Sequence, residues 1–166
     1  MHADLSAFLN TFAVGDTTVV PRLVARLSLV LTDPAEYAAH FADDLAEGVI
    51  DPQELRDLAL IDSLLAEDLA VECDWQETAG QMAESLNYVL TQQGRKLLVL
   101  PLSLGAEDEL GPERLDILQD ALEPLGLALV LFALDGDSYP LSVVAQDQSE
   151  TLLAQAQKLG FKLHTW

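Results

Sequence analysis

The spacing of apolar residues changes near residue 66, and this change constrains the fold more than any other feature of the chain. Before it, apolar side chains recur at the spacing of one helix face, as in Leu5, Phe8 and Phe12. After it, the segment LAVECDW (69–75) alternates along its length, which predicts a half-buried strand. The sequence therefore predicts an α+β fold with a helical N-terminal half and strands in the second half.

Two similar motifs mark helix starts in the first half, DPAE at 33–36 and DPQE at 51–54. Each has an aspartate that can cap the helix, a proline at the first helical position and a glutamate three residues after the cap. Asp74 and Glu77 repeat the capping spacing in front of a further amphipathic segment. We therefore expect helices to begin after Asp33, Asp51 and Asp74.

The last third of the chain predicts the remaining strands, near 127–134, 140–145 and 161–165. Together with 69–75 they form a small, mainly antiparallel sheet covered by helices. The segment KLLVLPL (96–102) is an edge strand at best, because Pro101 cannot donate to a ladder. Since no long linker interrupts the chain, we expect a single domain over 1–166, with a helical part (1–66) and a strand-containing part (67–166).

The chain is strongly acidic, with 28 Asp and Glu against eight Lys and Arg, and a formal net charge of −20. Fourteen of these acids, but only one base, lie between Asp33 and Glu77. This charge disfavours direct binding to nucleic acid or to anionic membranes, and it leaves a basic protein as a candidate partner. The single cysteine, Cys73, and the lack of a secretory signal or a membrane-length apolar run predict a cytoplasmic protein with no membrane segment.

Three short motifs resemble an uncharacterised bacterial family of acidic α+β proteins, a domain of unknown function. They are ECDW at 72–75, LDGDSYPLSVV at 134–144 and LGF at 159–161. The resemblance covers about residues 55–166, and the N-terminal helices add nothing to it. It implies a fold and a bacterial cytosolic setting, but no reaction and no catalytic residue.

The segment DGDSYP (135–140) is interpreted as a turn between two strands rather than as a metal loop. A calcium loop that began at Asp135 would need a bidentate acid at its twelfth position, where this chain has Gln146. The same residue types are typical of a turn, since Gly136 allows a positive φ and Pro140 can start a strand where no ladder donor is needed.

A metal site nevertheless remains an alternative. If strand 69–75 lies beside the 127–145 hairpin, four carboxylates could converge at one end of the sheet and hold a divalent cation: Glu72, Asp74, Asp135 and Asp137. This arrangement would suit a small metal-dependent enzyme.

Other catalytic and cofactor motifs are absent from the sequence. The three histidines have no zinc-binding spacing, and the chain has no phosphate-binding glycine loop and no G-x-S-x-G nucleophile motif. Cys73 lies on the apolar side of its strand, which predicts a buried, inert thiol. We therefore expect no cofactor and no catalytic residue.

The sequence favours a non-catalytic acidic module that binds another protein, with a toxin-neutralising or regulatory role. The expected partner-binding residues are Asp43, Asp44, Glu47, Asp57, Asp62, Trp75 and Tyr139. The metal-dependent enzyme is the alternative. DNA mimicry is less favoured, because several acids of the 33–77 stretch are already explained as helix caps.

Overall fold

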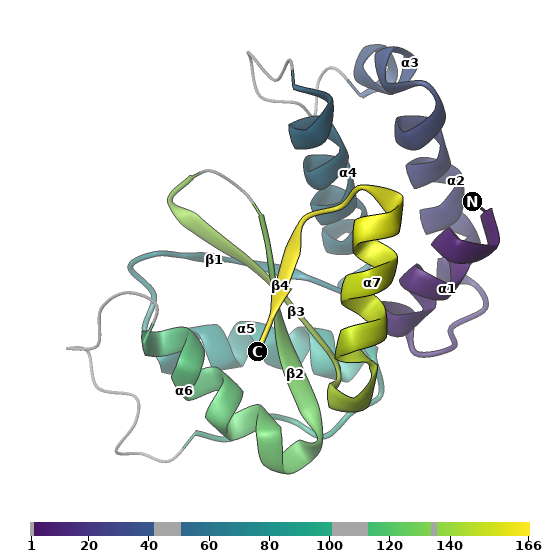
Figure 1. Cartoon of the computed structure of the whole chain (residues 1–166). Coiled ribbons are helices and arrows are strands. Elements are labelled where there is room, and N and C mark those ends of the chain that lie inside the picture. Colours follow the sequence, from purple (N-terminus) through teal and green to yellow (C-terminus); the bar gives the residue numbers. More distant parts are fainter. Residues whose placement is uncertain (1, 42–50, 101–112, 134–135) are drawn as a thin grey trace.

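The computed structural model of the chain describes residues 2–41, 51–100, 113–133 and 136–166 (Figure 1). No helix in these ranges combines the length and the apolar character needed to cross a membrane. The helices of the first half are α1 (His2–Ala13), α2 (Val19–Thr32), α3 (Pro34–His40) and α4 (Pro52–Ala66). They are followed by β1 (Val71–Asp74), α5 (Ala79–Gln92), α6 (Glu113–Leu122), β2 (Leu127–Phe132), β3 (Ser138–Ala145), α7 (Ser149–Leu159) and β4 (Leu163–Thr165). This order confirms the predicted α+β fold.

The two DP-x-E motifs begin helices, as the sequence predicts. The Asp33 carboxylate accepts a hydrogen bond from the Glu36 backbone N–H at 2.9 Å, and Pro34 occupies the first turn of α3. Asp51 caps α4 in a similar way, accepting from the Gln53 backbone N–H at 3.0 Å. These aspartates satisfy backbone donors that would otherwise lack a partner at the helix start.

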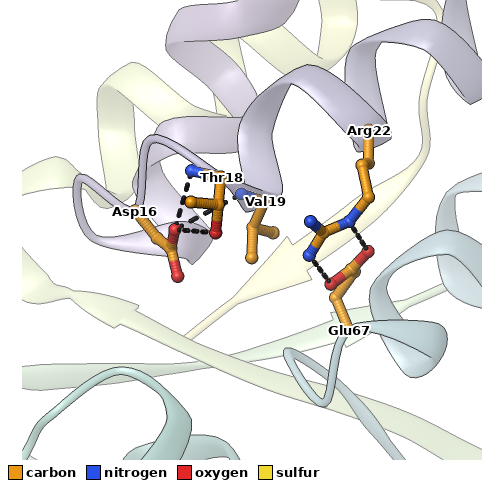
Figure 2. Close-up of polar contacts among 5 residues, drawn as sticks. All are labelled: Asp16, Thr18, Val19, Arg22 and Glu67. Carbon is orange, nitrogen blue, oxygen red and sulfur yellow. Dashed lines mark hydrogen bonds and ion pairs between the residues drawn. The ribbon is translucent and has the colours of Figure 1, made fainter.

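The start of α2 is stabilised by Asp16, which the sequence motifs did not identify (Figure 2). Its carboxylate accepts hydrogen bonds from the Thr18 backbone N–H at 2.8 Å and the Thr18 hydroxyl at 2.7 Å. The Thr18 hydrogen bond lowers the pKa of Asp16. Farther along α2, Arg22 forms a two-pronged ion pair with Glu67, which follows α4 (Figure 2). The Arg22 side chain is 58% exposed, so solvent screens this pair and its contribution to stability is small.

The predicted start of α5 is wrong by four residues. Thr78, not Asp74, is the cap, and it forms a capping box with Gln81. Asp74 and Glu77 instead close the preceding turn, where the Glu77 carboxylate accepts from the Asp74 backbone N–H at 3.2 Å. The spacing of Asp74 and Glu77 therefore corresponds to a turn before α5, but the Thr78 hydroxyl and the Gln81 side chain cap the helix.

The four strands form one antiparallel sheet in the order β1-β3-β2-β4. Each of the four predicted strand segments contains or overlaps an observed strand. β2 and β3 occupy the middle of the sheet, and most of their residues are buried. Strands that are buried on both faces consist of nearly continuous apolar residues, as β2 does. Both faces of the sheet are therefore covered.

Helices cover the two faces of the sheet in two separate layers (Figure 1). On one face, Val130, Phe132 and Val144 pack in a core cluster with α1, α2, α4 and α7. On the other face, Leu129 and Val143 pack in a second cluster with α5 and α6. The outer surface of the α5–α6 layer is therefore separated from the N-terminal helices by the sheet.

The segment DGDSYP joins β2 to β3, in agreement with its interpretation as a connection between strands, but residues 138–140 already belong to β3, so the turn is shorter than predicted. Asp135 lies outside the described residues, and Gly136 does not adopt the positive φ that its residue type allows. The register of β2 with β3 ends at Leu131 opposite Leu141, the residue after Pro140. Pro140 has no N–H to donate to β2, whereas on its other side β3 continues to pair with β1, with Pro140 opposite Glu72.

The predicted edge strand at 96–102 does not form within its described part. Residues 96–100 contain no strand, and 101–102 lie outside the described residues. The backbone of Leu98 bonds instead to the Asn87 side chain, through Leu98 N–H to Oδ1 at 2.7 Å and Nδ2–H to the Leu98 carbonyl at 3.2 Å. The Asn87 amide of α5 thus satisfies the backbone N–H and carbonyl of Leu98, as a neighbouring strand would.

Val14 has a backbone conformation that is unfavourable for its residue type. It has φ of 52° in the α1–α2 connection, although it is β-branched, and its side chain is 45% exposed. We expect Val14→Asn to raise the free energy of unfolding by about 0.5–1 kcal/mol, since asparagine tolerates the left-handed region better. Urea denaturation measures this change. Val99→Asn, at a position without positive φ, is the matched control and should give no gain; equal effects would contradict the strain argument.

Candidate functional site

The acids expected to bind a partner do not form one exposed surface in the described residues. Asp43, Asp44 and Glu47 lie outside the described residues, and Asp62 is half-buried on α4. The expectation that Asp57 is exposed is wrong, since only 6% of this residue is accessible.

Asp57 is buried because it bonds to the segment between α7 and β4. Its carboxylate accepts from the Lys162 backbone N–H at 2.9 Å and from the Gln53 side-chain amide at 3.1 Å. Burial raises the pKa of Asp57, against the opposing effect of these two hydrogen bonds. Asp57 thus has a structural role.

Trp75 and Tyr139, the two expected aromatic anchors, have different environments. Trp75 follows β1 and is 46% exposed, so its ring is accessible to a partner. Tyr139 lies opposite Cys73 in the β1–β3 register and is half-buried. The buried Arg114 guanidinium lies 5.9 Å from the centre of the Tyr139 ring, a cation–π distance. Tyr139 therefore already has a partner inside the protein.

The alternative metal site is not assembled by the residues that the structure describes. Glu72 accepts a hydrogen bond from the Ser138 hydroxyl at 2.6 Å, and Asp74 accepts from the Gln76 backbone N–H at 2.8 Å. Within the described ranges, no three His, Cys, Asp or Glu side chains are placed to hold a metal ion, and Asp137 joins no such group. Asp135 lies outside these ranges.

The prediction that Cys73 is buried is confirmed. The residue is fully buried and forms no disulfide. Burial raises the pKa of the Cys73 thiol to about 12, and the nearby Glu77 charge acts in the same direction. Almost no thiolate exists at neutral pH, so the chemistry of a cysteine nucleophile is disfavoured.

A groove runs along the outer side of α5, and we call it the α5 groove. Its volume is about 510 Å³, and its wall includes Glu77, Gln81, Glu84, Ser85, Tyr88 and Thr91. These residues recur at helical spacing, so they share one side of the helix. Leu97, from the segment that Asn87 holds against α5, also lines the groove.

The α5 groove has large exposed apolar groups at one end. Tyr88 is 73% exposed, Leu97 is 55% exposed and the nearby Val99 is 82% exposed. A soluble protein usually exposes such side chains singly, so three in one short region mark a candidate contact surface. Sequence reasoning missed this region because residues 96–102 were interpreted as a strand.

A row of acids follows the outer side of α6, and we call it the α6 stripe. It consists of Glu113, Asp116, Asp120 and Glu123, all of which are exposed. Their spacing of three, four and three residues places them on one side of the helix. This spacing is visible in the sequence, but the higher density of acids at 33–77 favours that stretch as the candidate surface.

The α5–α6 layer has carboxylates without exposed bases on its two helices. α5 contains no Lys or Arg, and the one base of α6, Arg114, is buried and donates to the Glu77 carbonyl. Arg95 and Lys96 lie beyond the end of α5, beside Pro124 and Leu125. The α6 stripe and the α5 groove are thus two negative features of this layer, and the groove also has exposed apolar groups.

One comparison with known proteins gives a match. The family model described as "Domain of unknown function (DUF6630)" matches residues 3–166, so the similarity to an uncharacterised domain family includes the N-terminal helices, which the expected coverage of about 55–166 left out. No curated protein matches the chain, and no solved structure matches it.

Proposed function

Because the chain belongs to the DUF6630 family, a domain of unknown function, we propose its function from its surface: it is a non-catalytic module that binds a basic segment of another protein across α5 and α6. The binding surface consists of the α6 stripe and the α5 groove. A toxin-neutralising or regulatory role is compatible with such a surface. We also propose a cytoplasmic location, which the lone, reduced Cys73 supports.

The observation that carries the proposal is the placement of Asp120 and Glu123 at the C-terminal end of α6. Glu113 and Asp116 lie in the first turn, where carboxylates stabilise a helix, so helix stability alone explains them. Asp120 lies in the last turn and Glu123 follows it, and there a negative charge faces the negative end of the helix dipole. Helix stability does not explain these two acids, whereas recognition of a basic partner does.

Exposed apolar groups on α5 and in the segment that follows it support a protein partner rather than a small cation. Tyr88, Leu97 and Val99 offer contact area for apolar side chains, and tyrosine is enriched at protein interfaces. Opposite charge speeds the encounter with a basic partner and disfavours acidic ones.

The test compares two double variants of equal charge change. Asp120→Lys/Glu123→Lys alters the α6 stripe, and Glu54→Lys/Glu150→Lys alters exposed acids of the opposite layer. The probe is a synthetic amphipathic helical peptide with arginines on its polar face, measured by fluorescence anisotropy at about 50 and about 150 mM salt. We expect the first variant to bind roughly tenfold more weakly than the second.

The Asp120→Lys/Glu123→Lys variant should be more stable than the wild type by about 0.5 kcal/mol, since cations stabilise a helix C-terminus. A gain in stability with a loss of binding would separate recognition from folding. Equal affinities of the two double variants, or an unmeasurable affinity of the wild type, would contradict the proposed function.

A further inference from the structure

Glu84 and Tyr88 lie four residues apart on α5, and both line the α5 groove. Side chains at this spacing are neighbours on a helix surface. Glu84 is exposed and forms no hydrogen bond or ion pair within the described part of the chain, and the Tyr88 ring is 73% exposed. A carboxylate and an open aromatic face are therefore available side by side.

Glu77, which also lines the α5 groove, contributes a buried carboxylate oxygen. Its Oε1 accepts from the Asp74 backbone N–H at 3.2 Å, whereas its Oε2 is buried and, among the described residues, has only the Cys73 thiol beside it. A thiol is a weak hydrogen-bond donor, so this buried acceptor is poorly satisfied, at a cost to stability. A ligand that donates a hydrogen bond to this oxygen would remove that cost.

The other polar side chains of the groove are largely engaged within the protein. Asn87 holds Leu98 through two hydrogen bonds, and the Thr91 hydroxyl donates to the Asn87 carbonyl at 2.7 Å. The Gln81 carbonyl oxygen accepts from the Thr78 backbone N–H at 2.9 Å. The carboxylates of Glu77 and Glu84 are thus the acceptors that remain for a ligand.

We propose that the α5 groove binds an arginine side chain of the basic partner segment, with its guanidinium against the Tyr88 ring and the Glu84 carboxylate. This inference rests on the proposed function. A guanidinium stacks on an aromatic face while its edge donates to a carboxylate, and it has further N–H groups for the Glu77 oxygen. A lysine ammonium is a more strongly hydrated point charge and offers no such planar donor edge. The groove, at about 510 Å³, has the volume of a typical ligand pocket.

The test uses two versions of the amphipathic peptide, one with arginine and one with lysine at every cationic position. Both have the same charge, so the general attraction of the α6 stripe acts on both. We expect the wild type to bind the arginine peptide about fivefold more tightly. Tyr88→Leu should abolish this preference, and Tyr88→Phe, which retains the ring, should keep it. Glu84→Gln should weaken arginine-peptide binding by about fivefold.

The outcomes separate this inference from the proposed function. If Asp120→Lys/Glu123→Lys weakens peptide binding but Tyr88→Leu leaves the arginine preference unchanged, the proposed function stands and the arginine site is wrong. A wild type without an arginine preference would also overturn the site. If the wild type binds neither peptide, both proposals fail. Thermal melting of each variant checks that the exposed substitutions at Tyr88 and Glu84 leave the fold intact.

Discussion

Replacing Gln93 by leucine is expected to lower the free energy of unfolding by about 2–4 kcal/mol, because two buried carbonyl groups would lose their donor. Gln93 follows α5 and is only 7% exposed. Its Nε2 donates to the Phe12 carbonyl at 3.0 Å and to the Val143 carbonyl at 2.9 Å. Each of these acceptors would keep its buried position without a hydrogen bond.

The position of the two acceptors explains why the effect should be large. Phe12 lies near the end of α1, and Val143 lies in the central strand β3, beyond the point where β1 stops pairing. One side chain thus connects the N-terminal helices to the sheet and to α5. Leucine has a similar volume, so the loss would come from hydrogen bonding and not from a cavity.

Urea denaturation of the variant and the wild type measures the change, with Gln92→Leu as the control. Gln92 is the exposed last residue of α5, so its replacement should change the free energy of unfolding by less than about 0.5 kcal/mol. A Gln93→Leu protein as stable as the control would show that water or rearranged groups satisfy the two carbonyls.

Local interactions made much of the fold predictable from the sequence. Asp33 and Asp51 cap helices through bonds to residues two or three positions away, and short spacing rules describe such contacts. The helix ends at Gly126 and Gly160 are also local, since both glycines adopt the left-handed conformation that their residue type favours. The strands followed from alternation and from continuous apolar runs.

Long-range polar contacts could not be predicted, and they account for the errors at the candidate site. Asp57 was assigned to the surface because its neighbours in sequence are acidic, but its partner Lys162 lies 105 positions away. The α5 groove depends on Asn87, whose side chain fixes the course of residues 96–100. The α6 stripe differs, since its helical spacing was already visible in the sequence.

The second large effect is expected at Asp57, where Asp57→Ala should lower the free energy of unfolding by about 2 kcal/mol at neutral pH. Alanine would leave the Lys162 backbone N–H without its acceptor and would remove one bond from the Gln53 amide. The Gln53 amide also donates to the Gly160 carbonyl at 2.7 Å, so it retains one partner. Asp57 and Gln53 together hold the connection between α7 and β4 against α4.

The pH dependence of this site gives a sharper test through Asp57→Asn, which retains the shape and one acceptor but cannot ionise. Burial raises the pKa of Asp57 above 3.8, so the folded state binds its proton more strongly than the unfolded state does. The part of the Asp57 contribution that depends on its protonation is therefore greatest below pH 3.8 and is lost as the pH rises through the raised folded-state pKa, while its hydrogen bonds remain. We expect the stability of the wild type minus that of Asp57→Asn to fall as the pH rises from 3.8 to the folded-state pKa of Asp57 and then to stay constant. Urea denaturation at several pH values measures this difference. A difference that rises with pH would mean that the hydrogen bonds from Lys162 and Gln53 outweigh burial and that the pKa of Asp57 is lowered.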